Sequence, residues 1–336
     1  MTGGEADGDA DTEQDDDALT YADAGVDIED SEAATAALVG AVSEQADTTE
    51  YAGLVDLGDQ YLALATDGVG TKLLVAEAVD DYSTVGIDCI AMNVNDLVAA
   101  GVEPAAFVDY LAVDVPDEAR AAELGEGLAA GAEEAGVALV GGETAVMPEV
   151  VRGFDIAGTV AGLATEDDLF PGDAEAGDAL VGFPSSGIHS NGLTLAREAA
   201  TREGGYDEPY PYNGYETVGD ALLEPTRIYT HLLAAFREHG VHAAAHVTGG
   251  GWTNLERMGE FRYAVSDPLP AQPVFEYVRD AGGVSDEEMH RTFNMGTGFV
   301  VALPEDDAAS LASETDGEII GRVEGGDGVA IRGLTL

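Results

Sequence analysis

The excess of acidic residues constrains this chain more than any other feature of its sequence. Asp and Glu number 66 against 13 Lys and Arg, which gives a formal net charge of -53 at pH 7. In dilute buffer such a charge destabilises a compact state by self-repulsion, whereas at 1 M salt the Debye length falls to about 3 Å and screens it. We therefore expect adaptation to concentrated salt, and no nucleic-acid partner, since phosphates repel an acidic surface.

The chain is long enough for two domains. It has 336 residues, 45% of them hydrophobic, which is enough to bury one large core or two moderate ones. No apolar run is long enough to span a membrane, and the acidic N-terminus does not resemble a secretory signal. Cys89, the single cysteine, cannot form an intrachain disulfide and is interpreted as a small core residue. We expect a soluble, cytoplasmic protein with no membrane partner.

Hydrophobic periodicity indicates an acidic tail followed by two mixed α/β halves. Residues 1–17 hold eight acidic residues and no basic one, which predicts a solvated tail. A first domain is expected over 18–166 and a second over 167–336, with the Gly- and Pro-bearing stretch 165–177 as the hinge. Expected helices are 31–45, 88–101, 118–135, 193–201 and 226–239; expected strands are 60–66, 105–113, 137–140, 156–164, 178–184, 241–247, 296–303 and 317–325. In the helix 88–101, Asn93 and Asp96 are expected to project together from the side opposite the packed face.

The segment TDGVGTK, residues 66–72, directly follows a predicted strand and has the features of an anion-binding turn. Gly68 and Gly70 allow backbone N–H groups to approach a phosphate, and Lys72 supplies a positive charge. The glycine spacing differs from that of a Walker A loop, so ordinary P-loop chemistry is not indicated. The alternative is a glycine turn that only joins two elements, but Lys72 is the only lysine of the chain, and its retention here favours phosphate binding.

Four carboxylates stand beside Gly, Asn or apolar residues rather than within acidic runs: Asp67, Asp96, Asp109 and Glu143. Magnesium prefers oxygen ligands, typically one or two carboxylates together with substrate phosphates and water. Carboxylates that converge on a glycine turn would therefore suit Mg-ATP. The alternative for each of them, in a chain this acidic, is a solvated surface group.

Two further segments place glycines and polar side chains before a predicted helix. In SSGIHSNG, residues 185–192, hydroxyl, amide and backbone N–H groups suit a phosphate or oxyanion, and His189 titrates near neutral pH. TGGGWTN, residues 248–254, repeats the pattern of glycines at a helix start. Simple helix capping is the alternative for both segments.

Two other candidates carry less weight. His242 and His246 are spaced like a zinc pair, but a strand would separate them along its length and no third ligand is evident. FNMGTG, residues 293–298, fits a nucleotide loop, and a turn that enters the following strand is the plainer interpretation.

Taken in order, YADAGVDI, TDGVGTK, VGIDCIAMNVNDLV, GVEP, DYLA, GGETAVMP, SSGIHSNG, EPTRIY, HVTGGGWTN and RTFNMGTG resemble the aminoimidazole ribonucleotide synthetase family. The resemblance covers about residues 21–302. YADAGVDI and RTFNMGTG are its most diagnostic parts, because the motifs between them recur in a wider superfamily that includes thiamine-monophosphate kinase, selenophosphate synthetase, formylglycinamidine ribonucleotide synthetase and a hydrogenase maturation factor. The haloarchaeal type of the enzyme is expected from the acidic composition.

This resemblance implies a two-domain mixed α/β fold and a homodimer whose N-terminal sheets pair into a barrel. It implies an ATP-dependent cyclo-ligase, with ATP and Mg2+ as cofactors and formylglycinamidine ribonucleotide as the small-molecule substrate. His189, Asn191 and Lys72 would be catalytic, and Asp67, Asp96 and Glu143 would bind the metal. The implied ATP-site residues are Asp67, Gly68, Gly70, Thr71, Lys72, Asn93, Asp96, Asp109, Glu143, Ser190, Gly249, Gly250, Gly251 and Asn294.

The chain also departs from the family pattern. Many relatives carry a glycine- and lysine-rich loop that closes over ATP; the corresponding residues 43–60 contain no lysine and keep only Tyr51, Gly53 and Gly58 as lid residues. Ile188 precedes His189 where relatives commonly have proline. A superfamily kinase that acts on another acceptor, and a nucleotide-binding regulatory subunit, are the competing interpretations.

Overall fold

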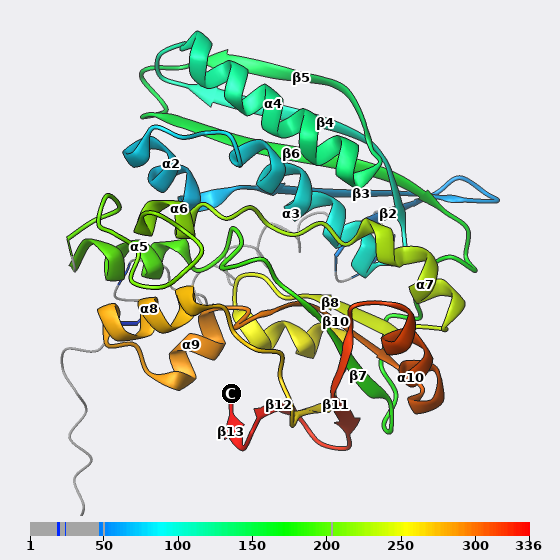
Figure 1. The fold of residues 1–336 in the computed structure, drawn as a ribbon. Helices are drawn as coiled ribbons and strands as arrows, with labels where there is room; N and C mark the ends of the chain where they lie inside the picture. The colour runs from blue at the N-terminus through cyan, green and yellow to red at the C-terminus, as the bar shows by residue number, and fades with distance from the viewer. Residues whose placement is uncertain (1–18, 21–23, 25–46, 50, 203) are drawn as a thin grey trace, which may run out of the picture.

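The computed structural model describes residues 19–20, 24, 47–49, 51–202 and 204–336. The predicted acidic tail, the predicted helix 31–45 and most of the YADAGVDI segment lie outside these residues. Within the described ranges the strands form two sheets, one from each half of the chain, with helices packed between and around them (Figure 1). The predicted two-part, mixed α/β fold is confirmed. No described helix is both long and apolar enough to cross a bilayer.

The first sheet contains six described strands in the order β1-β2-β3-β6-β4-β5, and only the β4–β5 pair is parallel. The strands are β1 Asp47–Thr48, β2 Gly53–Asp56, β3 Tyr61–Gly68, β4 Glu103–Val113, β5 Ala138–Val146 and β6 Phe154–Ala164. The predicted strand 137–140 is longer than expected, because β5 continues through the segment GGET as an exposed edge strand.

Two helices, α3 Val85–Ala99 and α4 Glu118–Ala135, cover one face of this sheet. As predicted, α4 ends at Gly136, which adopts a left-handed conformation with φ of 72°. Glycines allow the two helices to approach closely: a Cβ on Gly86 would lie 2.1 Å from the backbone nitrogen of Leu128.

The opposite face of the first sheet carries exposed apolar side chains. Cross-strand register places Val108 beside Thr159, and Leu64 beside Ala161, on this face. Five large apolar side chains on β2, β3, β4 and β6 are between 39% and 46% exposed: Val55, Leu64, Val108, Tyr110 and Leu163. No described element packs over this face, which we call the outer face.

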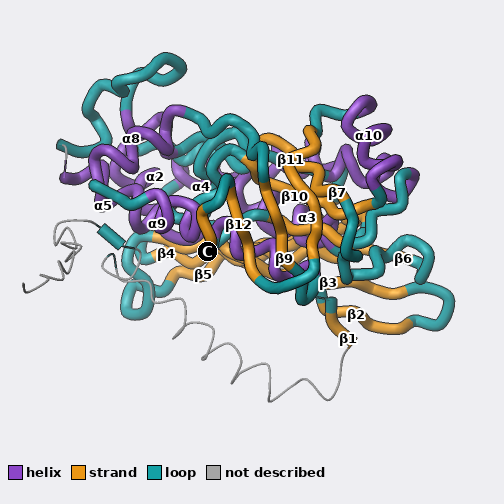
Figure 2. Tube along the Cα trace, turned by 90° about the horizontal axis from the view of Figure 1, so that it is seen from below, coloured by secondary structure: helices purple, strands orange, loops and turns teal. Residues whose placement is uncertain are grey.

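The second sheet has seven described strands in the order β13-β12-β9-β11-β7-β10-β8. Its strands are β7 Ala179–Pro184, β8 Ala243–His246, β9 Arg262–Val265, β10 Thr297–Leu303, β11 Glu318–Glu324, β12 Gly328–Ile331 and β13 Leu334–Thr335. The remaining helices are η1 Gly70–Lys72, α2 Leu73–Val79, α5 Leu193–Arg202, α6 Val218–Leu222, η2 Thr230–Leu232, α7 Leu233–Glu238, η3 Gly251–Met258, α8 Pro273–Gly282, α9 Asp286–Thr292 and α10 Glu305–Glu314. Figure 2 shows α5, α8 and α9 grouped at one end of the molecule.

Helix α3 lies between the two sheets, in contact with β3 and β6 of the first and β8 of the second (Figure 1). The expectation that one side of this helix faces outward is therefore wrong, and Asn93 and Asn95 are fully buried. Cys89 is also fully buried, which confirms its interpretation as a core residue.

The predicted helix 226–239 is shorter than expected. Helical structure begins only at Thr230, and residues 224–229 have no regular secondary structure. Side chains of the first half bind this stretch: Asn95 accepts from the backbone N–H of Tyr229 at 2.9 Å and donates to the carbonyl of Arg227 at 2.9 Å. These bonds replace those that a helix would make, which explains the discrepancy.

Candidate active site

Asp67 stands at the end of β3, where Asn93 of α3 fixes its backbone. The side-chain amide of Asn93 accepts from the Asp67 N–H at 2.9 Å and donates to the Asp67 carbonyl at 3.0 Å. The Asp67 carboxylate accepts the N–H of Gly68 at 2.7 Å. Burial raises the pKa of Asp67, and the nearby charge of Asp96 raises it further. Asp67 and Asp96 therefore lie close enough to repel each other.

Asp96 is paired with His246, the last residue of β8. The Nδ1 atom of His246 lies 3.0 Å from an Asp96 carboxylate oxygen, and His246 is 1% exposed against 21% for Asp96. The Asn95 amide nitrogen lies 3.4 Å from Nε2 of His246. Because an amide nitrogen can only donate, Nε2 is the acceptor, and Nδ1 carries the proton directed at Asp96. Asp96, on α3, thus has Asp67 of the first sheet on one side and His246 of the second sheet on the other.

A cation completes this cluster. The guanidinium of Arg257, in η3, lies over the ring of Tyr51 at 5.2 Å from its centroid. Its charge opposes the rise in the pKa of Asp67. Burial raises the pKa of Tyr51, the charge of Arg257 opposes this, and Asp96 adds to it. Tyr51, one of the expected lid residues, therefore lies in a site that contains Asp67, Asp96, His246 and Arg257.

Strand register places Asp109 on the same face of the sheet as Asp67. Asp67 pairs with Gly158, Gly158 pairs with Asp109, and Asp109 pairs with Gly142 in one row across four strands. Paired residues project to the same face, but the Phe107 ring covers Gly158 between the two acids, and the Asp109 carboxylate lies over Gly142 on its other side. Burial raises the pKa of Asp109.

Glu143 does not join these acids within the chain. It follows Gly142 on β5 and pairs with Tyr110, so it projects onto the outer face, opposite Asp67 and Asp109. The expected set of Asp67, Asp96 and Glu143 is therefore not assembled at one point. Across the described part of the chain, no group of three His, Cys, Asp or Glu side chains is arranged to hold a metal.

The loop with His189 is buried and held in a specific conformation. His189 is 1% exposed and has a φ of 66°, an uncommon conformation for a residue other than glycine. Its Nε2 accepts from the N–H groups of Ser186 at 3.1 Å and Arg227 at 3.5 Å. Its Nδ1 therefore carries the proton, and this buried atom has no hydrogen-bond partner among the described residues.

His189 is neutral in this environment. Burial lowers its pKa well below the usual value, and the neighbouring His246, Lys72 and Arg227 act in the same direction. At neutral pH the residue is thus a hydrogen-bond donor through Nδ1 rather than an imidazolium acid. Asn95 contacts both His246 and the carbonyl of Arg227, and the Arg227 N–H contacts His189, so the His189 loop lies near the acidic cluster.

The two glycine-bearing motifs lie side by side. A Cβ on Gly70 would be 4.0 Å from the carbonyl of Ser190, and the hydroxyls of Thr71 and Thr194 are 2.9 Å apart. The third motif joins them, since a Cβ on Gly249 would lie 3.5 Å from the Asn191 amide oxygen. TDGVGTK, SSGIHSNG and TGGGWTN therefore meet, as expected of a single pocket.

The environment of Lys72 differs from the expectation that its side chain faces a phosphate. It is fully buried, and its Nζ lies 2.7 Å from a carboxylate oxygen of the equally buried Asp88. It also donates to the carbonyl of Glu224 at 2.6 Å. Its charge is thus directed into the protein, away from the open side of the glycine turn.

Three other residues expected at the ATP site make hydrogen bonds or close packing contacts within the protein. The Asn294 amide donates to the carbonyls of Gly187 and Ile188 and so holds the loop that contains His189. Ser190 is bonded to Thr226. A Cβ on Gly251 would lie 2.3 Å from the carbonyl of His290, so this glycine allows two backbones to pack.

Known proteins match this chain along most of its length. The descriptions "AIR synthase related protein, N-terminal domain" and "AIR synthase related protein, C-terminal domain" match residues 49–164 and 175–333. A phosphoribosylformylglycinamidine cyclo-ligase from Methanosarcina acetivorans is 47% identical over 315 residues, which are 91% of this chain and 95% of the relative. The chain belongs to the phosphoribosylformylglycinamidine cyclo-ligase family. The family resemblance drawn from the sequence is confirmed.

Other members and fold relatives agree with this assignment. The Pyrococcus horikoshii cyclo-ligase is 47% identical over 302 residues, 86% of this chain and 89% of its own. The solved structure of AaThiL complexed with AMPPCP and TMP has a TM-score of 0.67 at 18% identity, over 93% of this chain and 96% of that one. At that identity the likeness concerns the fold alone.

Within this cyclo-ligase fold, sequence reasoning missed His246, Asn95, Arg257 and Asp88 as parts of the site. His246 was considered only as half of a zinc pair, yet it binds Asp96, while His242 lies 2.9 Å from Asp178. Its position two residues before Thr248 of the TGGG motif was the available signal. Nothing in the sequence indicated that Asp88, in an apolar helix, would be the partner of Lys72.

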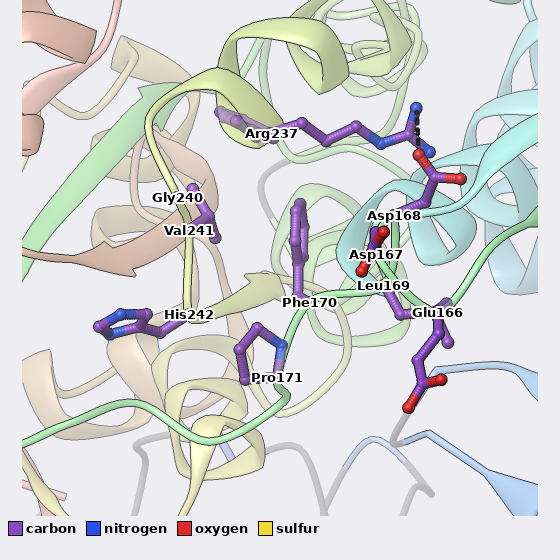
Figure 3. Close-up of a pocket in the computed structure, with 11 residues that line it drawn as sticks. Glu166, Asp167, Asp168, Leu169, Phe170, Pro171, Arg237, Gly240, Val241 and His242 are labelled. Atoms are coloured by element: carbon purple, nitrogen blue, oxygen red, sulfur yellow. Dashed lines mark ion pairs between the residues drawn. The ribbon is translucent and has the colours of Figure 1, made fainter.

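A separate hollow lies between residues 166–171 of the predicted hinge stretch and residues 236–242 at the end of α7 (Figure 3). It has a volume of about 390 Å³ and contains none of the expected site residues. An ion pair of 3.5 Å between Arg237 and Asp168 crosses one side of it. It is lined by Glu166, Asp167, Asp168, Leu169, Phe170, Pro171, Phe236, Arg237, Gly240, Val241 and His242.

Proposed function

We propose that this chain catalyses the ATP-dependent cyclisation of formylglycinamidine ribonucleotide to aminoimidazole ribonucleotide, with release of ADP and phosphate, in purine biosynthesis. The observation that carries the proposal is the 47% identity to a cyclo-ligase over 91% of this chain. The meeting of three glycine motifs beside Asp67 and Asp96 supports it, because phosphoryl transfer depends mainly on positioning and charge neutralisation.

The proposed reaction has two steps. The formyl oxygen of the substrate attacks the γ-phosphorus as the formamide N–H loses its proton, and the bond to the ADP oxygen breaks. An amidine nitrogen then attacks the same formyl carbon and loses a proton; the new C–N bond closes the ring as the C–O bond to phosphate breaks. Phosphorylation converts a poor leaving oxygen into a good one.

The described residues divide these tasks. Gly70 and Thr71 would offer backbone N–H groups to the phosphates, and Asn191 with Gly249 borders the same space. His189 holds its proton on Nδ1, with Nε2 engaged by two backbone N–H groups. We assign this N–H as a hydrogen-bond donor to the formyl oxygen or to the phosphoryl group that it receives.

A magnesium ion fits the acidic cluster in chemical terms. Asp67 and Asp96 offer hard oxygen ligands, and burial together with the charge of Asp96 raises the pKa of Asp67. Two carboxylates are sufficient when phosphates and water complete the coordination. A bound Mg2+ would neutralise charge on the triphosphate. Asp109 lies two strands from Asp67 and its carboxylate lies over Gly142, so it stands apart from this pair.

We further propose that two copies pair through the outer face into a homodimer. Apolar side chains on this face are exposed and uncovered by any described element, and exposed apolar surface of this extent is typical of interaction sites. Glu143 lies on the same face, so association would place it at the interface rather than at the metal.

A turnover assay of the full-length protein in molar KCl tests the proposed function. Formylglycinamidine ribonucleotide, ATP and Mg2+ are supplied, and aminoimidazole ribonucleotide and ADP are quantified. We expect equimolar products from the natural chain and loss of both from His189→Ala, by a factor on the order of 10². Absence of the imidazole product together with phosphorylation of thiamine monophosphate would identify a kinase of the same superfamily instead.

A further inference from the structure

Lys72 and Asp88 form a fully buried ion pair where the two halves of the chain meet. Lys72 ends η1 and Asp88 lies in the first turn of α3. Both side chains are 0% exposed, and the Lys72 Nζ lies 2.7 Å from one Asp88 oxygen. Removing two charges from water is costly, and such a pair persists only where its geometry and hydrogen bonds compensate. In this pair the short contact is supplemented by a hydrogen bond, because Nζ also donates to the carbonyl of Glu224 at 2.6 Å.

The pair holds a stretch of the second half, residues 223–229, which we call the crossing segment. The second oxygen of Asp88 accepts from the Thr226 N–H at 2.8 Å and from its hydroxyl at 2.6 Å. Thr84 and Asn95 of the first half bond to Leu223 and Tyr229 of the same segment. Hydrogen bonds from the first half therefore hold the crossing segment at both ends and in the middle.

The crossing segment in turn holds the His189 loop. The Arg227 N–H points at Nε2 of His189, and the carbonyl of Pro225 accepts the Ser186 hydroxyl at 2.5 Å. The Thr226 hydroxyl lies 3.2 Å from that of Ser190. His189 has a positive φ, a conformation that persists only when its surroundings impose it. Its geometry thus depends on a segment that the buried pair positions.

We propose that Lys72 and Asp88 are positioning residues, whose buried ion pair ties the phosphate-binding turn to the crossing segment and thereby sets the position of His189. The proposal rests on the proposed function in that His189 acts on the substrate. It explains why the chain keeps its only lysine at this position. A compact ammonium with three donors fits a closed space with two acceptors, whereas a planar guanidinium brings five donors that need partners.

The kinetic test compares Lys72→Met, Asp88→Asn and the double variant of the full-length protein. The double variant removes both charges, so it avoids the unpaired buried charge that each single variant leaves and keeps the test valid if a single variant fails to fold. We expect all three to lower kcat at least about tenfold, with KM for ATP within about twofold of the natural value. Lys72→Arg should also be impaired.

Two kinetic results would overturn the proposal. If Lys72 contacted phosphate, Lys72→Met would raise KM for ATP while Asp88→Asn would not. If the pair only supported the fold, the folded double variant would keep its natural kcat.

A measurement without substrate separates this proposal from the proposed function. Nitrogen-15 NMR of the imidazole groups reports the tautomer and protonation of His189, whose signal is identified by its absence in His189→Gln. We expect Nδ1–H in the natural protein, and in folded Asp88→Asn a mixed tautomer that protonates nearer to pH 6.5, the ordinary value for histidine. An unchanged His189 signal would refute the coupling even if the natural protein made no aminoimidazole ribonucleotide.

Discussion

A charged residue placed on the outer face tests the proposed homodimer. Val108 on β4 is 40% exposed and lies beside Thr159 of β6, near the middle of the face. Replacing Val108 with Glu places a carboxylate where two sheets would pack. The substitution projects away from α3 and α4, so it should leave the fold of the subunit intact.

The size of the effect follows from the exposure of Val108. Full burial of a valine side chain stabilises by about 1.5–3 kcal/mol, so the exposed 40% contributes about 1 kcal/mol on association. A two-fold interface contains the residue twice, and each buried carboxylate adds a desolvation cost of about 1 kcal/mol or more. The sum of about 4 kcal/mol weakens the dimer roughly 10³-fold.

Sedimentation velocity in molar KCl measures this directly. The natural chain should sediment as a dimer, and Val108→Glu as a monomer with an unchanged circular dichroism spectrum. Ile319→Glu is the matched control, because Ile319 is 45% exposed on β11 of the second sheet and should leave the dimer intact. A monomeric natural chain, or a Val108→Glu variant that stays dimeric at low micromolar concentration, would refute the outer face as the interface.

Three other predictions concern the acidic cluster and the net charge. Asp67→Asn should lower turnover by a factor on the order of 10² yet raise the melting temperature of the nucleotide-free protein at neutral pH. The raised pKa of Asp67 means that its ionised carboxylate destabilises the folded state. The gain in melting temperature from Asp67→Asn should therefore fade as the pH falls and Asp67 of the natural protein is itself protonated. Equal melting temperatures of the two proteins at pH 7 would contradict this prediction. Arg257→Gln should raise KM for ATP about tenfold, since a hydrogen bond to a charged group contributes about 1.5–3 kcal/mol. Arg322→Gln is the control, because the Arg322 side chain is 72% exposed on β11, and it should leave KM unchanged. The same KM for ATP in Arg257→Gln and the natural protein would remove Arg257 from the ATP site. Far-UV circular dichroism and activity should both decline as KCl falls below about 1 M, with sucrose unable to substitute because it does not screen charge; full activity in salt-free buffer would refute salt adaptation.

Elements whose pattern is dominated by local chemistry were predictable from the sequence. The strands β3, β4 and β6 and the helix α4 lie within a few residues of their expected ranges, because their apolar periodicity and glycine stops act locally. The family resemblance assigns residues of all three glycine motifs to one ATP site, and in the structure the motifs meet around Gly70, Ser190 and Gly249.

Residues whose role depends on the other half of the chain were harder to predict. A lysine after two glycines is expected to face a phosphate, and only the packed structure shows Asp88 and the carbonyl of Glu224 beside it. Glu143 failed to join Asp67 for a different reason. The strand expected over 137–140 continues through Glu143 as an edge strand, and in a strand a shift of one residue moves a side chain to the opposite face.

Helix α3 shows why the geometry of the site could not be read from periodicity. An amphipathic pattern assumes one packed and one solvated side, but α3 is packed against both sheets. Three polar residues within one turn therefore serve three different neighbours: Asn93 holds Asp67, Asn95 holds the crossing segment, and Asp96 holds His246. Because all three belong to one rigid helix, a displacement that separated Asp67 from Asp96 would also strain the bonds to residues 227 and 229, and these support His189. The acids proposed to bind Mg-ATP and the histidine proposed to act on the formyl group are thus positioned by the same helix.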